Sequence, residues 1–77
     1  MLIHFSKQSI KFLLKQNYQN QLRIVGAILR LPDGDVIKLK GETGYRLRVG
    51  NFRILFDKNG YVISIDRIDN RGQVYKR

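Results

Sequence analysis

The chain has 77 residues, no cysteine and one histidine, and its Lys and Arg outnumber Asp and Glu by 15 to 6, which gives a net charge of +9. This composition excludes disulfides, thiolate zinc sites and thiol nucleophiles, and the length suits one domain spanning residues 1–77. Because no apolar run is long enough to cross a membrane, we expect a cytoplasmic protein without cofactor or metal, attracted to nucleic acid, a membrane surface or an acidic protein.

The first 32 residues are predicted to form a short strand and two helices. Leu2–Phe5 is a strand-like run, and Ser6 is the expected N-cap of the first helix. That helix carries apolar side chains on one face, at Ile10, Leu13 and Leu14. After a polar connection, a second helix has apolar residues at helical spacing, at Leu22, Val25, Ile28 and Leu29. Pro32 ends it, and the pair is predicted to form a helical hairpin.

Residues 33–44 are predicted to link the hairpin to the rest of the chain. They contain three glycines and two lysines, Lys38 and Lys40. Glycine favours turns and irregular backbone, and the short apolar stretch around Val36 suits local packing. We therefore expect irregular or briefly extended backbone here.

Residues 45–68 are predicted to form a three-stranded antiparallel meander. Residues 45–49 alternate between apolar and basic side chains, and residues 52–56 form a second apolar-rich run. Gly50-Asn51 and Asn59-Gly60 are two-residue sequences typical of β-hairpin loops. The third strand begins at Tyr61 and continues to Ile68, and the remaining tail is polar and basic.

The first predicted loop determines which side chains share a face of the meander. It places Arg48 opposite Arg53, so Arg46, Arg48 and Arg53 lie on one face. The other face is apolar and can cover the helices, with Tyr45, Leu47, Val49, Phe52, Ile54 and Phe56. The second predicted loop places Arg53 opposite Asp66.

The three arginines admit two interpretations. Opposed like charges destabilise a sheet by about 0.2–1 kcal/mol per pair, and guanidinium groups bind phosphate well. Because a single acid at Asp66 leaves a positive surplus, we favour an anion site over a solvated charged face that Asp66 neutralises.

Several motifs together resemble the RelE/ParE superfamily of toxins from bacterial toxin–antitoxin pairs. They are Leu-Pro-x-Gly-Asp-Val (31–36), Lys-Leu-Lys-Gly (38–41) and Tyr-Arg-Leu-Arg-Val-Gly-Asn-Phe-Arg-Ile-Leu-Phe (45–56). The ending Arg-Ile-Asp-Asn-Arg-Gly-Gln-Val-Tyr (67–75) is similar to the family's terminal motif. The resemblance implies an α+β fold of order β-α-α-β-β-β, with a helical hairpin packed on an antiparallel sheet that the N-terminal strand joins.

The resemblance also implies an activity and its residues. RelE-like members are ribosome-dependent mRNA endoribonucleases, and ParE-like members inhibit DNA gyrase; an antitoxin silences both. Residues matching the nuclease motifs are Arg53, Arg71 and Tyr75 as catalytic groups, and Lys40, Arg46 and Arg48 as RNA-binding groups. We favour the RelE-like activity, with cognate antitoxin, ribosome and mRNA as partners and no membrane or small-molecule substrate. A ParE-like gyrase inhibitor and a non-enzymatic basic RNA-binding module are the alternatives.

One departure from the family affects the expected chemistry. Asn70 stands where many nuclease members have histidine, and no matching catalytic glutamate is present. Free arginine and tyrosine side chains titrate above about 12 and near about 10, so they carry protons poorly at neutral pH. Arginines can still stabilise phosphorane charge, and positioning of the substrate can contribute about 7–11 kcal/mol. The residues therefore predict cleavage that depends on the ribosome to fix the RNA geometry.

Overall fold

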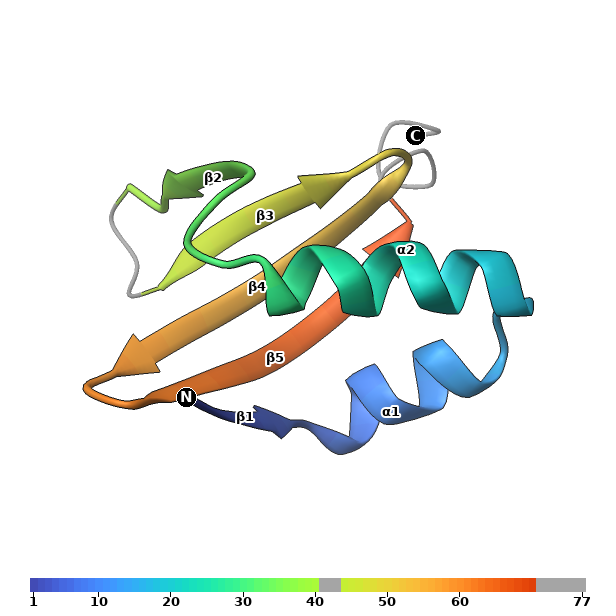
Figure 1. Cartoon of the computed structure of the whole chain (residues 1–77), viewed down its shortest axis with the longest axis horizontal. Helices are drawn as coiled ribbons and strands as arrows, with labels where there is room; N and C mark the ends of the chain where they lie inside the picture. Colours follow the sequence, from blue (N-terminus) through green and yellow to red (C-terminus); the bar gives the residue numbers. More distant parts are fainter. Residues whose placement is uncertain (41–43, 71–77) are drawn as a thin grey trace.

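In the computed structural model, which describes residues 1–40 and 44–70, two helices cover one face of a five-stranded sheet (Figure 1). The strands are β1 (Leu2–Phe5), β2 (Asp35–Lys38), β3 (Tyr45–Val49), β4 (Phe52–Asn59) and β5 (Val62–Asn70). The helices α1 (Lys7–Leu14) and α2 (Tyr18–Leu29) lie between β1 and β2 in the chain. This arrangement confirms the predicted α+β fold of a helical hairpin on a sheet.

The sheet has the order β1-β5-β4-β3-β2, and it is mixed rather than wholly antiparallel. β1 runs parallel to β5, and the other neighbouring pairs are antiparallel. β2 adds a strand that was expected at most as a short extended segment. It joins because its backbone pairs with β3 and because Val36, opposite Leu47, packs against the core.

Side-chain caps start both helices. The Ser6 hydroxyl accepts a hydrogen bond from the Ser9 amide at 3.1 Å, which confirms the predicted N-cap. The Asn17 side chain accepts one from the Asn20 amide at 2.8 Å and starts α2 directly after a short connection. Each cap satisfies one of the amides that a helix N-terminus leaves unpaired.

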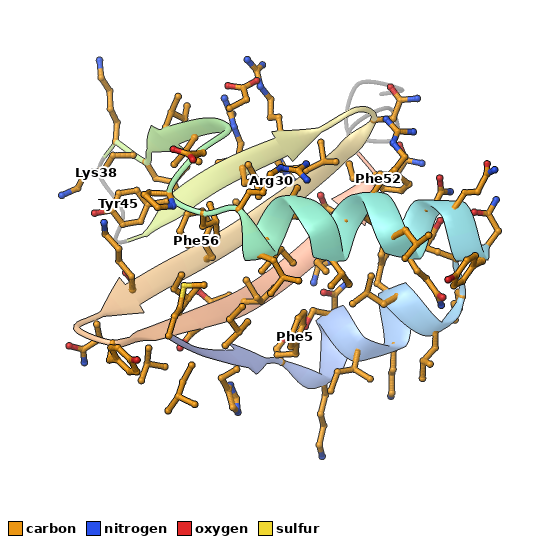
Figure 2. All side chains as sticks on the ribbon, in the orientation of Figure 1. Phe5, Arg30, Lys38, Tyr45, Phe52 and Phe56 are labelled. Atoms are coloured by element: carbon orange, nitrogen blue, oxygen red, sulfur yellow. The ribbon has the colours of Figure 1, made fainter. Side chains whose placement is uncertain are left out.

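The core lies between the helices and the inner, helix-facing side of the sheet. Leu47, Phe52, Ile54 and Phe56 are buried there, as the alternation predicted. The Tyr45 ring is half-buried and stacks on Phe56 with ring centroids 5.4 Å apart (Figure 2). The inner face therefore follows the period-2 pattern of β3 and β4.

The predicted inward faces of the helices are partly wrong. Ile28 is fully buried, as expected, but the neighbouring stripe residues Leu22 and Leu29 are 55% and 61% exposed. On α1, Ile10 and Leu14 are 46% and 74% exposed. The packed faces include the predicted Leu13 and Ile28, and the remaining contacts come from Ser9 and Phe12 on α1 and from Ile24 and Ala27 on α2. Apolar residues thus extend around more of each helix than the face that packs, and helical periodicity alone does not say which part packs.

The two β-hairpins use the same kind of loop. Gly50 and Gly60 have φ of 56° and 61°, and each is the first residue of a two-residue loop, the position that favours glycine in a type II′ turn. The Gly50-Asn51 loop is confirmed, whereas the predicted Asn59-Gly60 loop is wrong. Asn59 instead pairs with Val62, so the second loop is Gly60-Tyr61.

A β-bulge then changes the register between β4 and β5. Phe56 pairs with Ile65, but Leu55 pairs with Arg67, so Asp66 is an extra residue on β5. The bulge lets Ile65 and Ile68, three residues apart, both point into the core. Together, the loop position and the bulge shift the partner of Arg53 three residues along β5 relative to the prediction.

Side chains from the start of α1 replace β1 along the edge of β5. β1 ends at Phe5, and beyond it the Ser6 hydroxyl donates to the Asp66 carbonyl at 2.9 Å. The Gln8 amide nitrogen donates to the Ile68 carbonyl at 2.7 Å, and the Gln8 carbonyl accepts from the Ile68 amide at 2.9 Å. The Gln8 side chain therefore makes the two hydrogen bonds that a neighbouring strand would make, which protects this edge.

Candidate functional site

The face of the sheet turned away from the helices carries two of the predicted arginines, Arg48 and Arg53, in a row of charged residues across four strands. Asp35 of β2 pairs with Arg48 of β3, Arg48 pairs with Arg53 of β4, and Arg53 pairs with Asp69 of β5. Residues paired across neighbouring strands share a face. We call this outer-face set, Asp35, Arg48, Arg53 and Asp69, the charged row.

Ion pairs within the charged row bracket the two opposed arginines. Arg53 donates through Nε and Nη2 to the two carboxylate oxygens of Asp69, at 3.1 and 2.9 Å. Arg48 donates through Nε to Asp35 at 2.9 Å. The Arg53–Asp69 pair is the better shielded, with side-chain exposures of 28% and 21% against 39% and 52% for Arg48–Asp35.

The acid that compensates Arg53 is therefore Asp69, and the predicted pairing with Asp66 is wrong. Asp66 lies in the bulge and is exposed. The expectation of one acid against three arginines also understates the acids, because Asp35 reaches this face from the added strand β2. The charged row itself is electrically balanced, with two arginines and two aspartates.

A second row beside it supplies the positive surplus. It runs Ile37, Arg46, Leu55 and Arg67 across the same four strands. Arg67 lies 3.4 Å from the Asp69 carboxylate and is 55% exposed. The Nε atom of Arg46 is buried and has no hydrogen-bond partner within residues 1–40 and 44–70. Four arginines thus face two aspartates over these two rows.

The six residues predicted to form the site have different outcomes. Arg46, Arg48 and Arg53 share the outer face, as predicted from the alternation. Lys40 is exposed and follows the end of β2. The predicted catalytic residues Arg71 and Tyr75 lie outside the described residues. The catalytic set of Arg53, Arg71 and Tyr75 therefore stays a prediction.

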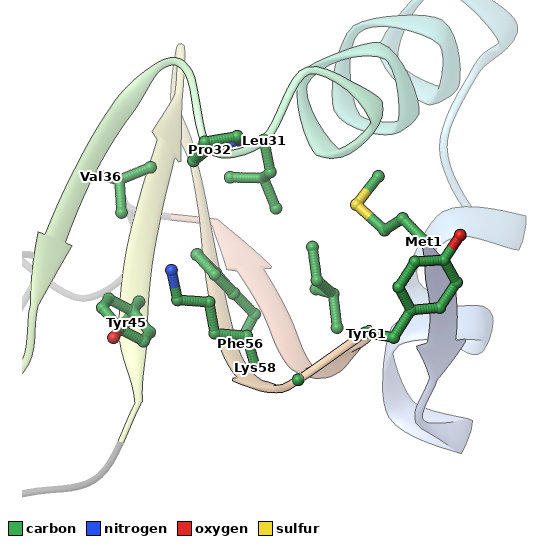
Figure 3. Close-up of a pocket in the computed structure, with 10 residues that line it drawn as sticks. Met1, Leu31, Pro32, Val36, Tyr45, Phe56, Lys58 and Tyr61 are labelled. Carbon is green, nitrogen blue, oxygen red and sulfur yellow. The ribbon is translucent and has the colours of Figure 1, made fainter.

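Sequence reasoning missed both the second acid and the cavity on the opposite side. Asp35 had no predicted strand to carry it, although the Asp-Val-Ile-Lys run around it extends readily. On the inner side, an open and mainly apolar pocket of about 240 Å³ lies where α2 gives way to β2 (Figure 3). Leu31, Pro32, Val36, Tyr45 and Tyr61 are among its lining residues. The sheet separates this pocket from the charged row.

The described part of the chain has neither a cluster of metal-binding side chains nor a membrane-spanning helix. No group of three or more His, Asp or Glu side chains there lies close enough to hold a metal ion. No helix there has the length and hydropathy to span a membrane.

The fold described above is shared by small toxins that were solved together with their antitoxins. The chain is similar to a structure of the RelB–RelE antitoxin–toxin complex from Methanococcus jannaschii, with 32% identity, 94% of each chain covered and a TM-score of 0.74. The archaeal RelE–RelB complex from Pyrococcus horikoshii matches at 26% identity and a TM-score of 0.74, over 94% of this chain and 96% of that one. This protein belongs to the RelE toxin family.

More distant comparisons add support for the fold alone. The RelBE2 toxin–antitoxin complex from Mycobacterium tuberculosis matches at 18% identity over 91% of this chain and 96% of that one, with a TM-score of 0.71. No family model matches the sequence, and no curated protein matches it either.

Proposed function

We propose that this protein is the toxin of a toxin–antitoxin pair and that it cuts messenger RNA bound to the ribosome. The observation that supports this most is the cluster of Arg46, Arg48 and Arg53 on the face of the sheet opposite the helices. Guanidinium groups on adjacent strands present several donors to a phosphodiester, and their planar geometry suits phosphate oxygens. The similarity to RelE toxins supports the same activity.

The residues take the following roles in this proposal. Arg53 stabilises the charge that develops on the scissile phosphate, and Arg46, Arg48 and Lys40 bind the RNA backbone. Arg71 and Tyr75, assigned from the resemblance, complete the catalytic set. In the free protein the Asp69 carboxylate takes the two guanidinium donors of Arg53 that an incoming phosphate would use. The bidentate pair therefore holds Arg53 in a defined orientation before RNA binds.

Two features of the site support ribosome dependence, namely the lack of a nearby histidine and the charge balance of the charged row. His4 is the one histidine of the sequence, and it lies on β1, opposite Ser64 and away from the charged row. Without a histidine near Arg53, proton transfer is slow, and the two aspartates reduce the attraction of the row for free RNA. Fixed in-line geometry supplied by the ribosome would compensate for both, because positioning contributes about 7–11 kcal/mol.

The proposed partners follow from the charge and the comparisons. The Methanococcus jannaschii and Pyrococcus horikoshii relatives were solved together with RelB, and we expect a cognate antitoxin to bind this chain as well. With a net charge of +9, the chain should attract an acidic antitoxin at a salt-dependent rate. Translating ribosomes place the action in the cytoplasm.

A ParE-like gyrase inhibitor is the alternative activity. The absence of a histidine at Asn70 favours it, because a gyrase inhibitor needs no proton carrier. The Methanococcus jannaschii and Pyrococcus horikoshii structures, at 32% and 26% identity, contain RelE, which favours the nuclease.

The test is a translating extract with primer extension on the message. Wild-type protein should cut ribosome-bound mRNA and leave naked RNA nearly intact. Arg53→Ala should lose about 10²–10³ of the rate, the usual cost of removing a preorganised donor to a developing oxyanion. Tyr75→Ala should also reduce cleavage, whereas Lys7→Ala, on the exposed side of α1, serves as the control.

Two combinations of assay results would overturn the nuclease proposal. If ribosome-bound messages stay intact while purified gyrase loses supercoiling activity in the presence of the protein, the chain is a gyrase inhibitor. If neither process changes, the remaining alternative is a non-enzymatic RNA-binding module.

A further inference from the structure

The Asp69 carboxylate contacts two arginines at once. Its Oδ1 and Oδ2 atoms accept hydrogen bonds from Nε and Nη2 of Arg53, at 3.1 and 2.9 Å. The Nε atom of Arg67 lies 3.4 Å from the same Oδ2 atom, which is within ion-pair distance but longer than a usual hydrogen bond. Asp69 therefore has one cation opposite it on β4 and a second cation two residues earlier on its own strand.

The two ends of the charged row differ in this respect. At the other end, Asp35 accepts one hydrogen bond, from Arg48, and no second Lys or Arg within residues 1–40 and 44–70 lies at ion-pair distance from it. The Asp35 side chain is also 52% exposed, whereas that of Asp69 is 21% exposed. Among the described residues, Asp69 thus has an alternative cation and Asp35 does not.

The second arginine lowers the cost of separating Arg53 from Asp69. A poorly exposed carboxylate that lost every cationic partner would keep an unpaired charge, which is costly. Because Arg67 is already 3.4 Å away and its side chain is 55% exposed, Asp69 can form a hydrogen bond with Arg67 when Arg53 leaves. Two arrangements follow. In the closed one Arg53 binds Asp69, and in the open one Arg53 binds a phosphate and Asp69 binds Arg67.

We propose that Asp69 and Arg67 make the toxin select RNA that is held in place. Asp69 keeps Arg53 in the closed arrangement until a fixed phosphate displaces it. This inference rests on the proposed function, because it concerns the phosphate that Arg53 would contact. Asp69 and Arg67 act through Arg53, so they are residues that determine specificity without touching the substrate.

The selection comes from a difference in effective concentration. Asp69 is attached to the strand beside Arg53 and therefore competes for its donors at a high effective concentration. A phosphate of free RNA arrives from dilute solution and competes poorly. RNA fixed on the ribosome presents its phosphate at a similarly high effective concentration, because it is already positioned. Fixed RNA therefore opens the site, and free RNA leaves it closed.

A simpler role for Asp69 is to orient Arg53 and nothing more. Asp69→Asn would then slow the cleavage of free and ribosome-bound RNA alike, and Arg67 would act independently of Asp69. The two contacts on one oxygen atom favour the exchange, because orientation of Arg53 does not require Arg67.

The first experiment compares cleavage of naked and ribosome-bound messenger RNA by primer extension. Asp69→Asn should raise the rate on naked RNA about fivefold, the factor expected for loss of a partly exposed ion pair, and raise the rate on ribosome-bound RNA much less. The ratio of the ribosome-bound rate to the naked rate should therefore fall. Asp33→Asn removes the same charge at an exposed position outside the row and should leave this ratio near the wild-type value.

The second experiment does not need cleavage. The probe is a short 2′-O-methyl RNA oligonucleotide, which lacks the attacking hydroxyl, and it is titrated into the full chain while the arginine Nε–H signals are followed by NMR. In wild type the Arg53 signal should shift as the probe binds. The Nε–H of Arg67 should exchange with water more slowly, because it gains the hydrogen bond to Asp69. In Asp69→Asn the probe should bind about fivefold more tightly, and the exchange at Arg67 should not slow.

A double-mutant cycle separates the exchange from direct phosphate binding by Arg67. Arg67→Gln should weaken binding of the probe more in wild type than in the Asp69→Asn background, where Arg67 has no carboxylate to receive. Direct contact of Arg67 with phosphate would give equal losses in the two backgrounds. If thermal melts show that Asp69→Asn does not fold, Arg67→Gln is read alone. It makes the closed arrangement harder to leave, so it should raise the ratio of the ribosome-bound rate to the naked rate.

Several results would overturn the proposal. They are an unchanged ratio of rates in Asp69→Asn, slower cleavage of both kinds of RNA, an unchanged affinity of Asp69→Asn for the probe, or equal losses from Arg67→Gln in the two backgrounds. If wild type cuts neither kind of RNA, the proposed function fails. The titration and the double-mutant cycle still decide whether Asp69 moves from Arg53 to Arg67, so the two proposals can fail separately.

Discussion

The two faces of the sheet are built on different principles. The inner face is a continuous apolar surface in which Leu47, Ile54 and Ile68 are at most 1% exposed. The outer face carries a row of charges in which two arginines are opposed at the centre, with an aspartate on either side. An apolar face tolerates any neighbour of similar size, whereas a charged face depends on which residue stands opposite which.

This difference explains which features of the sheet could be predicted from the residue pattern and which could not. Alternation in residues 45–56 predicted the inner face and the shared face of Arg46, Arg48 and Arg53 correctly. It failed for the partner of Arg53, because a loop displaced to Gly60-Tyr61 and a bulge at Asp66 together changed the register by three residues. Neither feature leaves a clear mark in hydrophobic periodicity, and the bulge forms where β1 ends and side chains of α1 take over.

The helices show a related limit. Both helices and the Ser6 cap of α1 were predictable, but the packed side was predicted only in part, because apolar residues extend around more of each helix than the face that packs. The rotation of α1 depends on contacts such as that between Gln8 and β5, which join residues 60 apart in the chain. Long-range polar contacts of this kind are invisible to a local pattern.

The largest expected effect is a difference in stability between two neighbouring positions of β4, one on the inner face and one on the outer face. Ile54→Ala removes a fully buried side chain and should lower the free energy of unfolding by about 2–5 kcal/mol. Leu55→Ala, its half-buried neighbour on the outer face, should cost about 1 kcal/mol. Urea denaturation measures both, and Ile54→Val, at about 0.5–1.5 kcal/mol, covers the case in which Ile54→Ala does not fold. Equal losses at positions 54 and 55 would contradict the assignment of faces.

The next effect concerns the register that brings Asp69 to the outer face. Gln8→Ala leaves both the amide and the carbonyl of Ile68 without their partner, which should cost about 1–3 kcal/mol. Gln8→Glu keeps the acceptor for the Ile68 amide and loses the donor, so its loss should be smaller. Hydrogen exchange at the Ile68 amide should accelerate in Gln8→Ala and less in Gln8→Glu. Unchanged exchange in both variants would show that Gln8 does not hold this edge.

A smaller effect on stability, with an opposite effect on binding, is expected at Asp69. Asp69→Asn weakens the bidentate pair and leaves Arg48 and Arg53 opposed with less compensation, which should cost about 1 kcal/mol. The same change frees guanidinium donors and should tighten binding of a single-stranded RNA oligonucleotide. Arg53→Ala relieves the repulsion between Arg48 and Arg53, but it also leaves the Asp69 carboxylate without its bidentate partner. We therefore do not expect Arg53→Ala to stabilise the protein. An Asp69→Asn variant that binds RNA no better than wild type would argue against a phosphate site at Arg53.

The smallest effect is expected at the other end of the charged row. Arg48 and Asp35 are 39% and 52% exposed and share one hydrogen bond, so Asp35→Asn should change the free energy of unfolding by about 0.2–1 kcal/mol.

The effect of Asp35→Asn on RNA binding distinguishes two interpretations of the outer face. If Arg48 binds phosphate, Asp35→Asn adds a contact, and the slope of log affinity against log salt should steepen by about 0.7, the value for one phosphate of a single strand. If the row is only a self-neutralised surface, the removed negative charge raises affinity at low salt through the general field, and Asp33→Asn, an exposed neighbour outside the row, should do the same. A steeper slope for Asp35→Asn than for Asp33→Asn therefore supports a phosphate-binding role for Arg48, and equal slopes restrict that role to Arg53 and Arg46.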